Sequence, residues 1–149
     1  MERRIRNSAK ALIIKDGKML ATKINDKGDI FYIMPGGGQE SGETLEEAVI
    51  REVKEEFGFI VEPKSLEFVI EGVRGESFHR VDLVFLCEYI SELPNAEIIS
   101  DCNQIGYDWL SIENLINEPL YPSRLRKQIM NLYNGEETIV YLGDESMEE

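Results

Sequence analysis

Residues 36–59 read GGGQESGETLEEAVIREVKEEFGF, and this stretch decides the fold. Its second half carries apolar residues at intervals of three and four, the period of one buried helix face: Leu45, Ala48, Val49, Val53 and Phe57. Ser41 or the pair Glu43–Thr44 can cap the start of this helix, and Gly58 stands where a helix end favours a left-handed residue. The stretch therefore predicts a glycine turn that leads into a helix over residues 44–57.

The same helix carries three acidic residues on one face. Glu52, Glu55 and Glu56 are spaced i, i+3 and i+4, so their carboxylates project together. Like charges at this spacing destabilise a helix unless they are compensated, and a hard cation such as Mg²⁺, which takes oxygen ligands, compensates them. Arg51 is four residues from Glu47 and from Glu55, and it can pair with either. A solvated acidic surface is the alternative, and composition alone favours it.

The glycines in front of the helix change this balance. Pro35 and the run Gly36 to Gly38 connect a predicted strand to the helix. Such a connection is costly unless the backbone bends sharply or approaches a ligand closely. A sharp glycine turn before an acidic helix face is typical of a site for a metal ion and phosphates.

Outside this stretch, the hydrophobic pattern predicts a mixed sheet. Short apolar runs closed by turn residues indicate strands over 9–15, 19–24, 30–34, 66–73, 81–90 and 105–110, and helical spacing returns over 122–133. This order predicts an α+β fold, an α/β/α sandwich with a mixed β-sheet and two or three helices. We expect one domain over residues 1–135 and a solvated acidic tail over 136–149.

The composition argues against several classes of function. The 149 residues carry a net charge of −13, which argues against sequence-independent binding of DNA or RNA. The chain has no apolar run of about 18 residues, as a membrane span requires, and no apolar N-terminal stretch of signal-peptide length. Cys87 and Cys102 lack metal-ligand spacing, so we expect reduced thiols. Together these features predict a cytoplasmic protein with neither a nucleic-acid nor a membrane partner.

The glycine turn and the helix carry a known family motif. The Nudix box, Gly-x5-Glu-x7-Arg-Glu-U-x-Glu-Glu-x-Gly-U with U a bulky apolar residue, is matched without departure from Gly37 to Phe59. Glu43 is the first glutamate of the box, Arg51 its arginine and Gly58 its last glycine. By this match the chain resembles the Nudix hydrolases, and the residues before and after the box are compatible with the Nudix-type sandwich.

The resemblance implies a mechanism. Nudix hydrolases attack, with water, one phosphorus of a nucleoside diphosphate linked to a second group, X. By resemblance, Glu52, Glu55 and Glu56, with the Gly37 carbonyl, hold Mg²⁺, for which Mn²⁺ can substitute. Arg51 is implied to orient Glu52 through a salt bridge, and either Glu52 or Glu55 is implied to act as general base. Glu43 supports the helix start or joins a second metal ion.

Residues outside the box are the candidates for contact with a small nucleotide substrate. Tyr32 and Phe78 are candidates for stacking on a base. Arg74, His79 and Arg80 are candidates for binding phosphates. Each of these residues also fits plain packing or a solvated charge.

Other family signals are displaced or missing. Relatives often add an acid from the loop before the last strand. Glu97 and Asp101 lie in that loop here, whereas Asn103 and Gln104 stand closer to the usual place. The proline and tyrosine typical of hydrolases of ADP-ribose and of diadenosine polyphosphates are not found over residues 74–77, and the coenzyme A signature is not visible. These absences favour a nucleoside triphosphate or another nucleotide derivative.

Three alternatives share the fold. A non-catalytic nucleotide-binding or regulatory module commonly loses acids of the box, and this chain keeps them all. An isomerase of isoprenoid diphosphates needs a cysteine and a glutamate placed for carbon chemistry, which Cys87 and Cys102 do not offer. Decapping of messenger RNA needs a basic patch, which the acidic chain lacks. Relatives are commonly dimers, and the sequence leaves a homodimer open.

Overall fold

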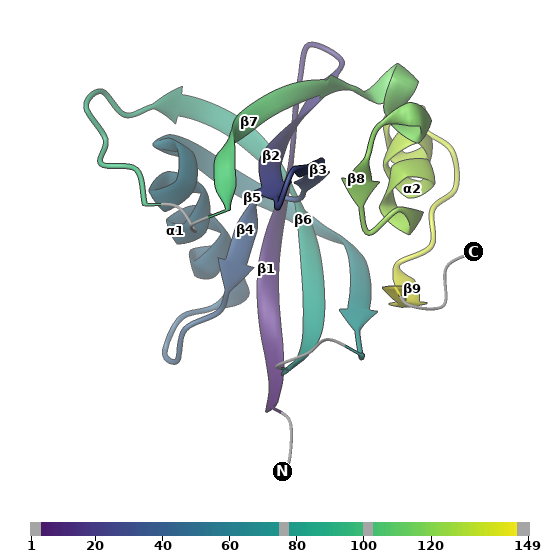
Figure 1. Cartoon of the computed structure of the whole chain (residues 1–149), viewed down its shortest axis with the longest axis horizontal. Coiled ribbons are helices and arrows are strands. Elements are labelled where there is room, and N and C mark those ends of the chain that lie inside the picture. The colour runs from purple at the N-terminus through teal and green to yellow at the C-terminus, as the bar shows by residue number, and fades with distance from the viewer. Residues whose placement is uncertain (1–3, 75–77, 100–102, 146–149) are drawn as a thin grey trace.

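The computed structural model describes residues 4–74, 78–99 and 103–145. The strands are β1 (Arg4–Lys15), β2 (Lys18–Asp26), β3 (Asp29–Ile33), β4 (Gly36–Gly38), β5 (Phe59–Gly72), β6 (Phe78–Glu92), β7 (Gln104–Ser111), β8 (Leu120–Tyr121) and β9 (Tyr141–Asp144). The helices are α1 (Leu45–Phe57), α2 (Arg124–Tyr133) and the short 3-10 helix η1 (Ile112–Asn117). Figure 1 labels these elements along the chain.

The sheet is organised around β1. Over most of its length β1 pairs in parallel with β6, from Arg4 opposite Phe78 to Ile13 opposite Cys87, and its other edge pairs antiparallel with β4. Beyond this point β1 turns into β2, which lies between β3 and β7. On the far side of β6 follow β5 and then β9, which is parallel to β5. The sheet is therefore mixed, as predicted.

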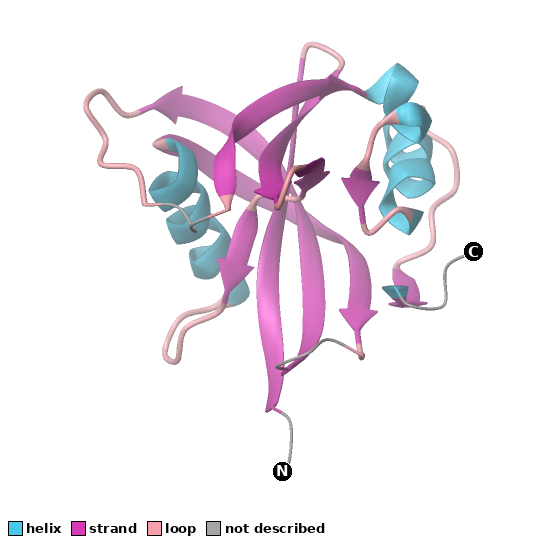
Figure 2. Cartoon of the chain, in the orientation of Figure 1, coloured by secondary structure: helices cyan, strands magenta, loops and turns pink. Residues whose placement is uncertain are grey.

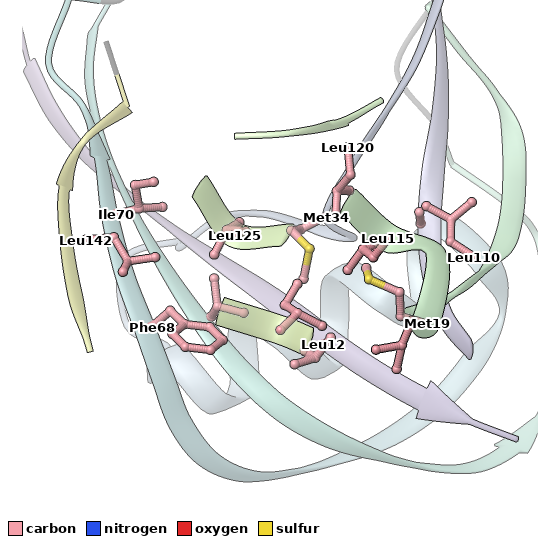
Figure 3. Close-up of a cluster of buried hydrophobic side chains, with 14 residues drawn as sticks. Leu12, Met19, Met34, Phe68, Ile70, Leu110, Leu115, Leu120, Leu125 and Leu142 are labelled. Atoms are coloured by element: carbon pink, nitrogen blue, oxygen red, sulfur yellow. The ribbon is translucent and has the colours of Figure 1, made fainter. Parts of the chain in front are cut away.

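The two faces of the sheet build two separate cores. One core lies under α1 and contains residues of alternating position on β1 and β6: Ala9, Ala11, Ile13, Phe85 and Cys87, packed on Val49, Val53 and Phe57. The other core lies under α2 and η1 and contains the intervening residues: Leu12 and Val84, packed with Phe68, Ile70, Leu115, Leu125 and Ile129. Figure 3 shows part of this second core, and Figure 2 shows the helices on the two sides of the sheet. The predicted α/β/α sandwich is confirmed.

Helix α1 is fixed at both ends by its own sequence. Thr44 is the N-cap: its hydroxyl accepts from the Glu47 N–H at 3.1 Å, and the Glu47 carboxylate accepts from the Thr44 N–H at 2.8 Å. This capping box satisfies two backbone donors at the helix start. Gly58 ends the helix with φ 72°, a left-handed conformation that favours glycine. Of the caps predicted, the structure therefore selects Thr44. Of the two partners predicted for Arg51, the structure pairs it with Glu55, whereas Glu47 is used in the cap.

Two segments differ from their predictions. β5 starts at Phe59 rather than at Leu66, because Phe59 and Val61 are buried in the α1 core. The predicted solvated tail is wrong for Tyr141–Asp144, which forms β9 because Leu142 is buried in the α2 core. Asp101, Cys102 and residues 75–77 lie outside the described residues. No helix of the described ranges is long and apolar enough to cross a membrane.

Candidate active site

The glycine turn brings the backbone into close contact with β1. Gly36 has φ 129°, and a Cβ there would lie 2.1 Å from the carbonyl oxygen of Ala9. Only glycine tolerates both this conformation and this approach. The turn thus becomes the short strand β4, which pairs with β1 and contacts α1 at Arg51, Glu52 and Glu56.

The register of β4 determines which backbone oxygens face the helix. Gly37 stands opposite Ala9 in the antiparallel pair of β4 and β1. Two residues to either side, the Ala11 N–H donates to the Pro35 carbonyl and the Gln39 N–H donates to the Asn7 carbonyl. In such a ladder the carbonyl of Gly37 also points to β1, and the carbonyls of Gly36 and Gly38 point away from it. In agreement, the Gly38 oxygen accepts from Arg51 Nη2 at 3.0 Å.

Arg51 joins the turn to the acidic face of α1. It binds Glu43 with two donors, Nη2 to Oε1 at 2.8 Å and Nε to Oε2 at 3.1 Å. Its Nη1 lies 3.1 Å from Glu52 Oε1 and 3.3 Å from Glu55 Oε2. The hydrogen bond from Arg51 and that from the Glu40 N–H hold the pKa of Glu43 below its usual range, and Glu43 in turn raises the pKa of Arg51. The predicted salt bridge from Arg51 to Glu52 is present.

Glu52 lies against Gly37. A Cβ at Gly37 would lie 2.6 Å from the carboxylate carbon of Glu52 and 2.7 Å from both of its oxygens. The Glu52 side chain is 18% exposed. Burial raises the pKa of this carboxyl, Arg51 lowers it and Glu55 raises it, so that the net direction is upward. Glu52 is therefore a partly buried carboxylate that can lie this close to residue 37 only because residue 37 is glycine.

Glu56 and Glu55 complete the acidic face. Glu56 Oε1 accepts from the Gly36 N–H at 2.8 Å, and Glu56 Oε2 accepts from Gln104 Nε2 at 3.3 Å. The side chain of Glu55 is 36% exposed, which is more than the 18% of Glu52. All three glutamates line one cavity of about 380 Å³ together with Gly36, Gly37 and Gly38.

These donors fit a hard divalent cation in kind. Carboxylate and backbone oxygens are what Mg²⁺ takes, and the acidic face concentrates negative charge. In the described parts of the chain no three acidic, histidine or cysteine side chains converge as a finished cation site, because each glutamate holds a donor of the protein. The chemistry of the donor set, and the space left by Gly37, agree with a cation that replaces those donors.

The residues predicted to contact substrate are divided by the structure. Phe78 lines the acidic cavity, with the guanidinium of Arg6 4.9 Å from its ring centre. Arg80 lies in a neighbouring cavity and is bound to two carboxylates. Neither Tyr32 nor Arg74 is among the described residues that line these two cavities.

Tyr32 and Arg74 have other contacts. Tyr32 donates to Asp108 on β7 at 2.5 Å, and this hydrogen bond with burial raises the pKa of Tyr32 to about 12. Arg74 is 68% exposed and lies 3.6 Å from Asp144. His79 lies 3.0 Å from Glu71. Of the predicted loop residues, Gln104 reaches the acidic cavity.

Sequence reasoning missed several residues near the site. Arg6, Ser8 and Lys10 alternate along β1, and Asp82 stands opposite Ser8 on β6. The signal available for them is the period of two of a strand. It became useful only with the parallel pairing of β1 and β6, which joins segments some seventy residues apart.

Comparisons with known proteins bear on this site. The model of the NUDIX domain family matches residues 5–132, which include the glycine turn and α1. The chain belongs to the Nudix family. It is similar to a Methanocaldococcus jannaschii protein named ADP-ribose pyrophosphatase, 42% identical over 126 residues, covering 83% of this chain and 72% of that protein. It is also similar to the Escherichia coli nucleoside triphosphatase NudI, 31% identical over 122 residues, covering 73% and 84%.

Solved structures agree with the Nudix fold. A NUDIX hydrolase from Nitrosomonas europaea superposes with a TM-score of 0.72 at 21% identity, covering 92% of this chain and 93% of that one. An ADP-ribose pyrophosphatase from Streptococcus suis superposes with a TM-score of 0.67 at 20% identity, covering 93% and 98%. At these identities the likeness shows the fold alone. Together with the sequence relatives, the family match confirms that the chain is a Nudix hydrolase.

Proposed function

We propose that this Nudix hydrolase cleaves, with Mg²⁺, the diphosphate linkage of a nucleoside diphosphate joined to a second group. The observation that carries the proposal is the contact between Glu52 and Gly37, with Arg51 binding the same carboxylate. A carboxylate held this closely against a backbone without a side chain is preorganised for a ligand that takes oxygen donors. We propose a nucleoside triphosphate or another nucleotide derivative as substrate, and the names of the two sequence relatives make ADP-ribose the first derivative to test.

The residues divide the binding of the metal ion between helix and turn. Glu52, Glu55 and Glu56 are the proposed carboxylate ligands, and Mn²⁺ is the proposed substitute for Mg²⁺. The carbonyl of Gly36 is a better backbone ligand than that of Gly37, because the register turns the Gly37 oxygen to β1. When bound, the metal ion neutralises phosphate charge and acidifies water. Arg51 donates to Glu52 and Glu55 and would keep both carboxylates in position when they bind the cation.

The chemical step needs one proton acceptor. A water oxygen forms a bond to one phosphorus, the bond from that phosphorus to the bridging oxygen breaks, and the water proton passes to a carboxylate. Glu52 is the first choice for this role because it lies against Gly37, only 18% exposed, and is held in place by Arg51. Glu55 is the second choice, because it is the more exposed of the two and is nearer to solvent.

The proposal is tested by turnover of a nucleotide panel. Phosphate or pyrophosphate release is measured with Mg²⁺, Mn²⁺ or EDTA for nucleoside triphosphates, ADP-ribose, nucleotide sugars and dinucleoside polyphosphates. Glu55→Gln is compared with Glu46→Gln, an exposed change on the same helix and outside the cavity. We expect metal-dependent turnover of one class, lowered about 100-fold or more by Glu55→Gln and unchanged by Glu46→Gln.

Binding without turnover would support the other function. If no member of the panel is hydrolysed and calorimetry still detects nucleotide and metal, the chain is a binding or regulatory module. Light scattering of the purified protein tests the expected homodimer. Fractionation of the cells that produce the protein tests the expected cytoplasmic location.

A further inference from the structure

A second cavity lies beside the acidic one. It has a volume of about 290 Å³, and its charged lining residues are Lys10, Arg80, Asp82 and Glu145. Small-molecule sites range from about 300 to 1,000 Å³, so this cavity holds one ring system rather than a whole nucleotide. Ser8 lines the acidic cavity and stands directly opposite Asp82 in the parallel register. Neighbouring strands are about 4.8 Å apart, so one ligand can lie across both cavities.

The charges of this second cavity cancel. Arg80 Nε donates to Asp82 Oδ1 at 2.9 Å, and Arg80 Nη2 donates to Glu145 Oε1 at 2.7 Å. Two carboxylates therefore stand against the two cations Arg80 and Lys10. Arg80 is also held in place by both acids, so it has little capacity to turn to a phosphate. The cavity favours a neutral group over an anion.

Asp82 is the polar group that a ligand would meet. The residue is 3% exposed and lines the second cavity together with Arg80, two positions before it on β6. A carboxylate offers about four acceptor positions. Arg80 is its hydrogen-bond partner in the described part of the chain and uses one oxygen. Burying a carboxylate is costly unless its oxygens are bonded, so Asp82 favours a ligand that brings an N–H or O–H donor.

The remaining wall of the cavity is apolar and partly aromatic. It is formed by Met34, which is 2% exposed, by Ile33, and by Tyr121 with Pro122. Tyr121 already carries the guanidinium of Arg126 at 5.0 Å from its ring centre, which fixes the ring. Apolar walls with one polar group at the edge suit a flat heterocycle better than a sugar, whose hydroxyls need several partners.

We propose that this second cavity takes the nucleobase of the substrate, and that Asp82 accepts a hydrogen bond from an exocyclic amino group on the edge of the base. The assignment rests on the proposed function for the identity of the ligand as a nucleotide. The diphosphate then lies in the acidic cavity and the base in the second one. Asp82 then favours bases that carry an exocyclic amine, and Arg80, which is itself bound to Glu145, holds Asp82 in position.

The test removes one donor from the base. kcat/KM is measured for ATP against purine riboside triphosphate and for GTP against inosine triphosphate, since each pair differs by one exocyclic amine. In the wild type we expect the better substrate to exceed its amine-free partner about 10-fold or more. In Asp82→Asn, Arg80 Nε keeps the amide oxygen and turns the amide NH₂ to the base, so the ratio falls to about 1. Asp26→Asn, an exposed change at the end of β2, is the matched control and keeps the ratio.

A binding measurement separates this inference from the proposed hydrolysis. Calorimetry in EDTA compares AMP, GMP, inosine monophosphate and purine riboside monophosphate, none of which has a diphosphate to cleave. An amine preference that Asp82→Asn removes supports the inference even if no panel member turns over. Hydrolysis with equal values for both pairs overturns the inference and leaves the proposed function intact. Equal binding of all four monophosphates, or binding equalled by ribose 5-phosphate, also overturns it, because the cavity then takes the sugar or phosphate.

Discussion

Replacing Gly37 by alanine tests whether the space beside Glu52 is needed for activity. The new Cβ would lie 2.6 Å from the Glu52 carboxylate carbon and 2.7 Å from each oxygen. Ordinary contact needs about 3.4 Å or more, so the carboxylate must move by nearly 1 Å. Arg51 binds the same carboxylate at 3.1 Å and limits where it can go. The substitution therefore displaces one proposed ligand without removing it.

The expected effects on stability and on activity differ. Overpacking costs about 1–3 kcal/mol, and the loss of chain freedom on changing glycine to alanine returns about 0.4–1 kcal/mol. The free energy of unfolding should thus fall by about 2.6 kcal/mol at most. Misplacing a catalytic group by about 1 Å can lower the rate about 100-fold, so kcat/KM should fall by that order.

A second glycine in the same turn supplies the control. Gly42 has φ 90°, and a Cβ there would meet no atom within 4 Å. Gly42→Ala is strained by its backbone conformation, which costs on the order of 1–2 kcal/mol, but it leaves Glu52 in place. We expect urea denaturation to show similar stability losses for both variants and the activity loss in Gly37→Ala alone. Gly37→Ala with activity within threefold of Gly42→Ala would refute the reasoning.

Three further predictions concern the arginine, the C-terminal strand and acid stability. Arg51→Lys keeps the charge but cannot bind both oxygens of Glu43 and the Gly38 carbonyl together. We expect the free energy of unfolding in urea to fall by about 2–3 kcal/mol and kcat to fall at least 10-fold, and wild-type values of both would contradict this prediction. Leu142→Ala should destabilise the protein by about 2–3 kcal/mol in urea denaturation, because Leu142 is 6% exposed in the α2 core. Ile139 is 61% exposed, so Ile139→Ala should change stability by less than about 0.5 kcal/mol, and equal effects of the two changes would show that β9 does not contribute to the core. Arg51 lowers the pKa of Glu43 from about 4.5, so the contribution of Glu43 to stability is present above that pH and is lost as the pH falls through its pKa in the folded protein. In an acid titration followed by circular dichroism, Glu43→Gln should then lose less stability than the wild type, and parallel unfolding curves for the two proteins would contradict this linkage.

Local patterns were sufficient for the helix that carries the acidic face. The period of α1, its cap at Thr44 and its end at Gly58 are all recorded within residues 44–58, so the helix was predicted within one residue. The strand β9 was not predicted, because the short apolar run over residues 139–142 lies between acidic pairs at 136–137 and 144–145, a pattern that favours a solvated tail. Its stability comes from pairing with β5, which is far away in the sequence.

The contacts of Arg51 show where a helical period is insufficient. Spacing predicted pairs with residues four positions away, and the contact with Glu55 exists. The closest partner, however, is Glu43, which lies before the helix and is brought near by the turn. Glu47 has the same spacing as Glu55 and is instead used by the capping box. Competition between a cap and a salt bridge for one carboxylate is decided by backbone geometry, which spacing does not record.

Substrate-contact residues depend on strand pairing more than on residue type. Tyr32 and Phe78 are both aromatic, but only Phe78 has its side chain at the acidic cavity, because its strand lies parallel to β1 with Phe78 opposite Arg4. Once that register is known, the strand period of two places Phe78, Arg80 and Asp82 on the same face of β6. A parallel pair joined through a crossover cannot be found from either strand alone. The proposed metal ligands on α1 can therefore be predicted from one helix, whereas the residues proposed to contact the base require the sheet.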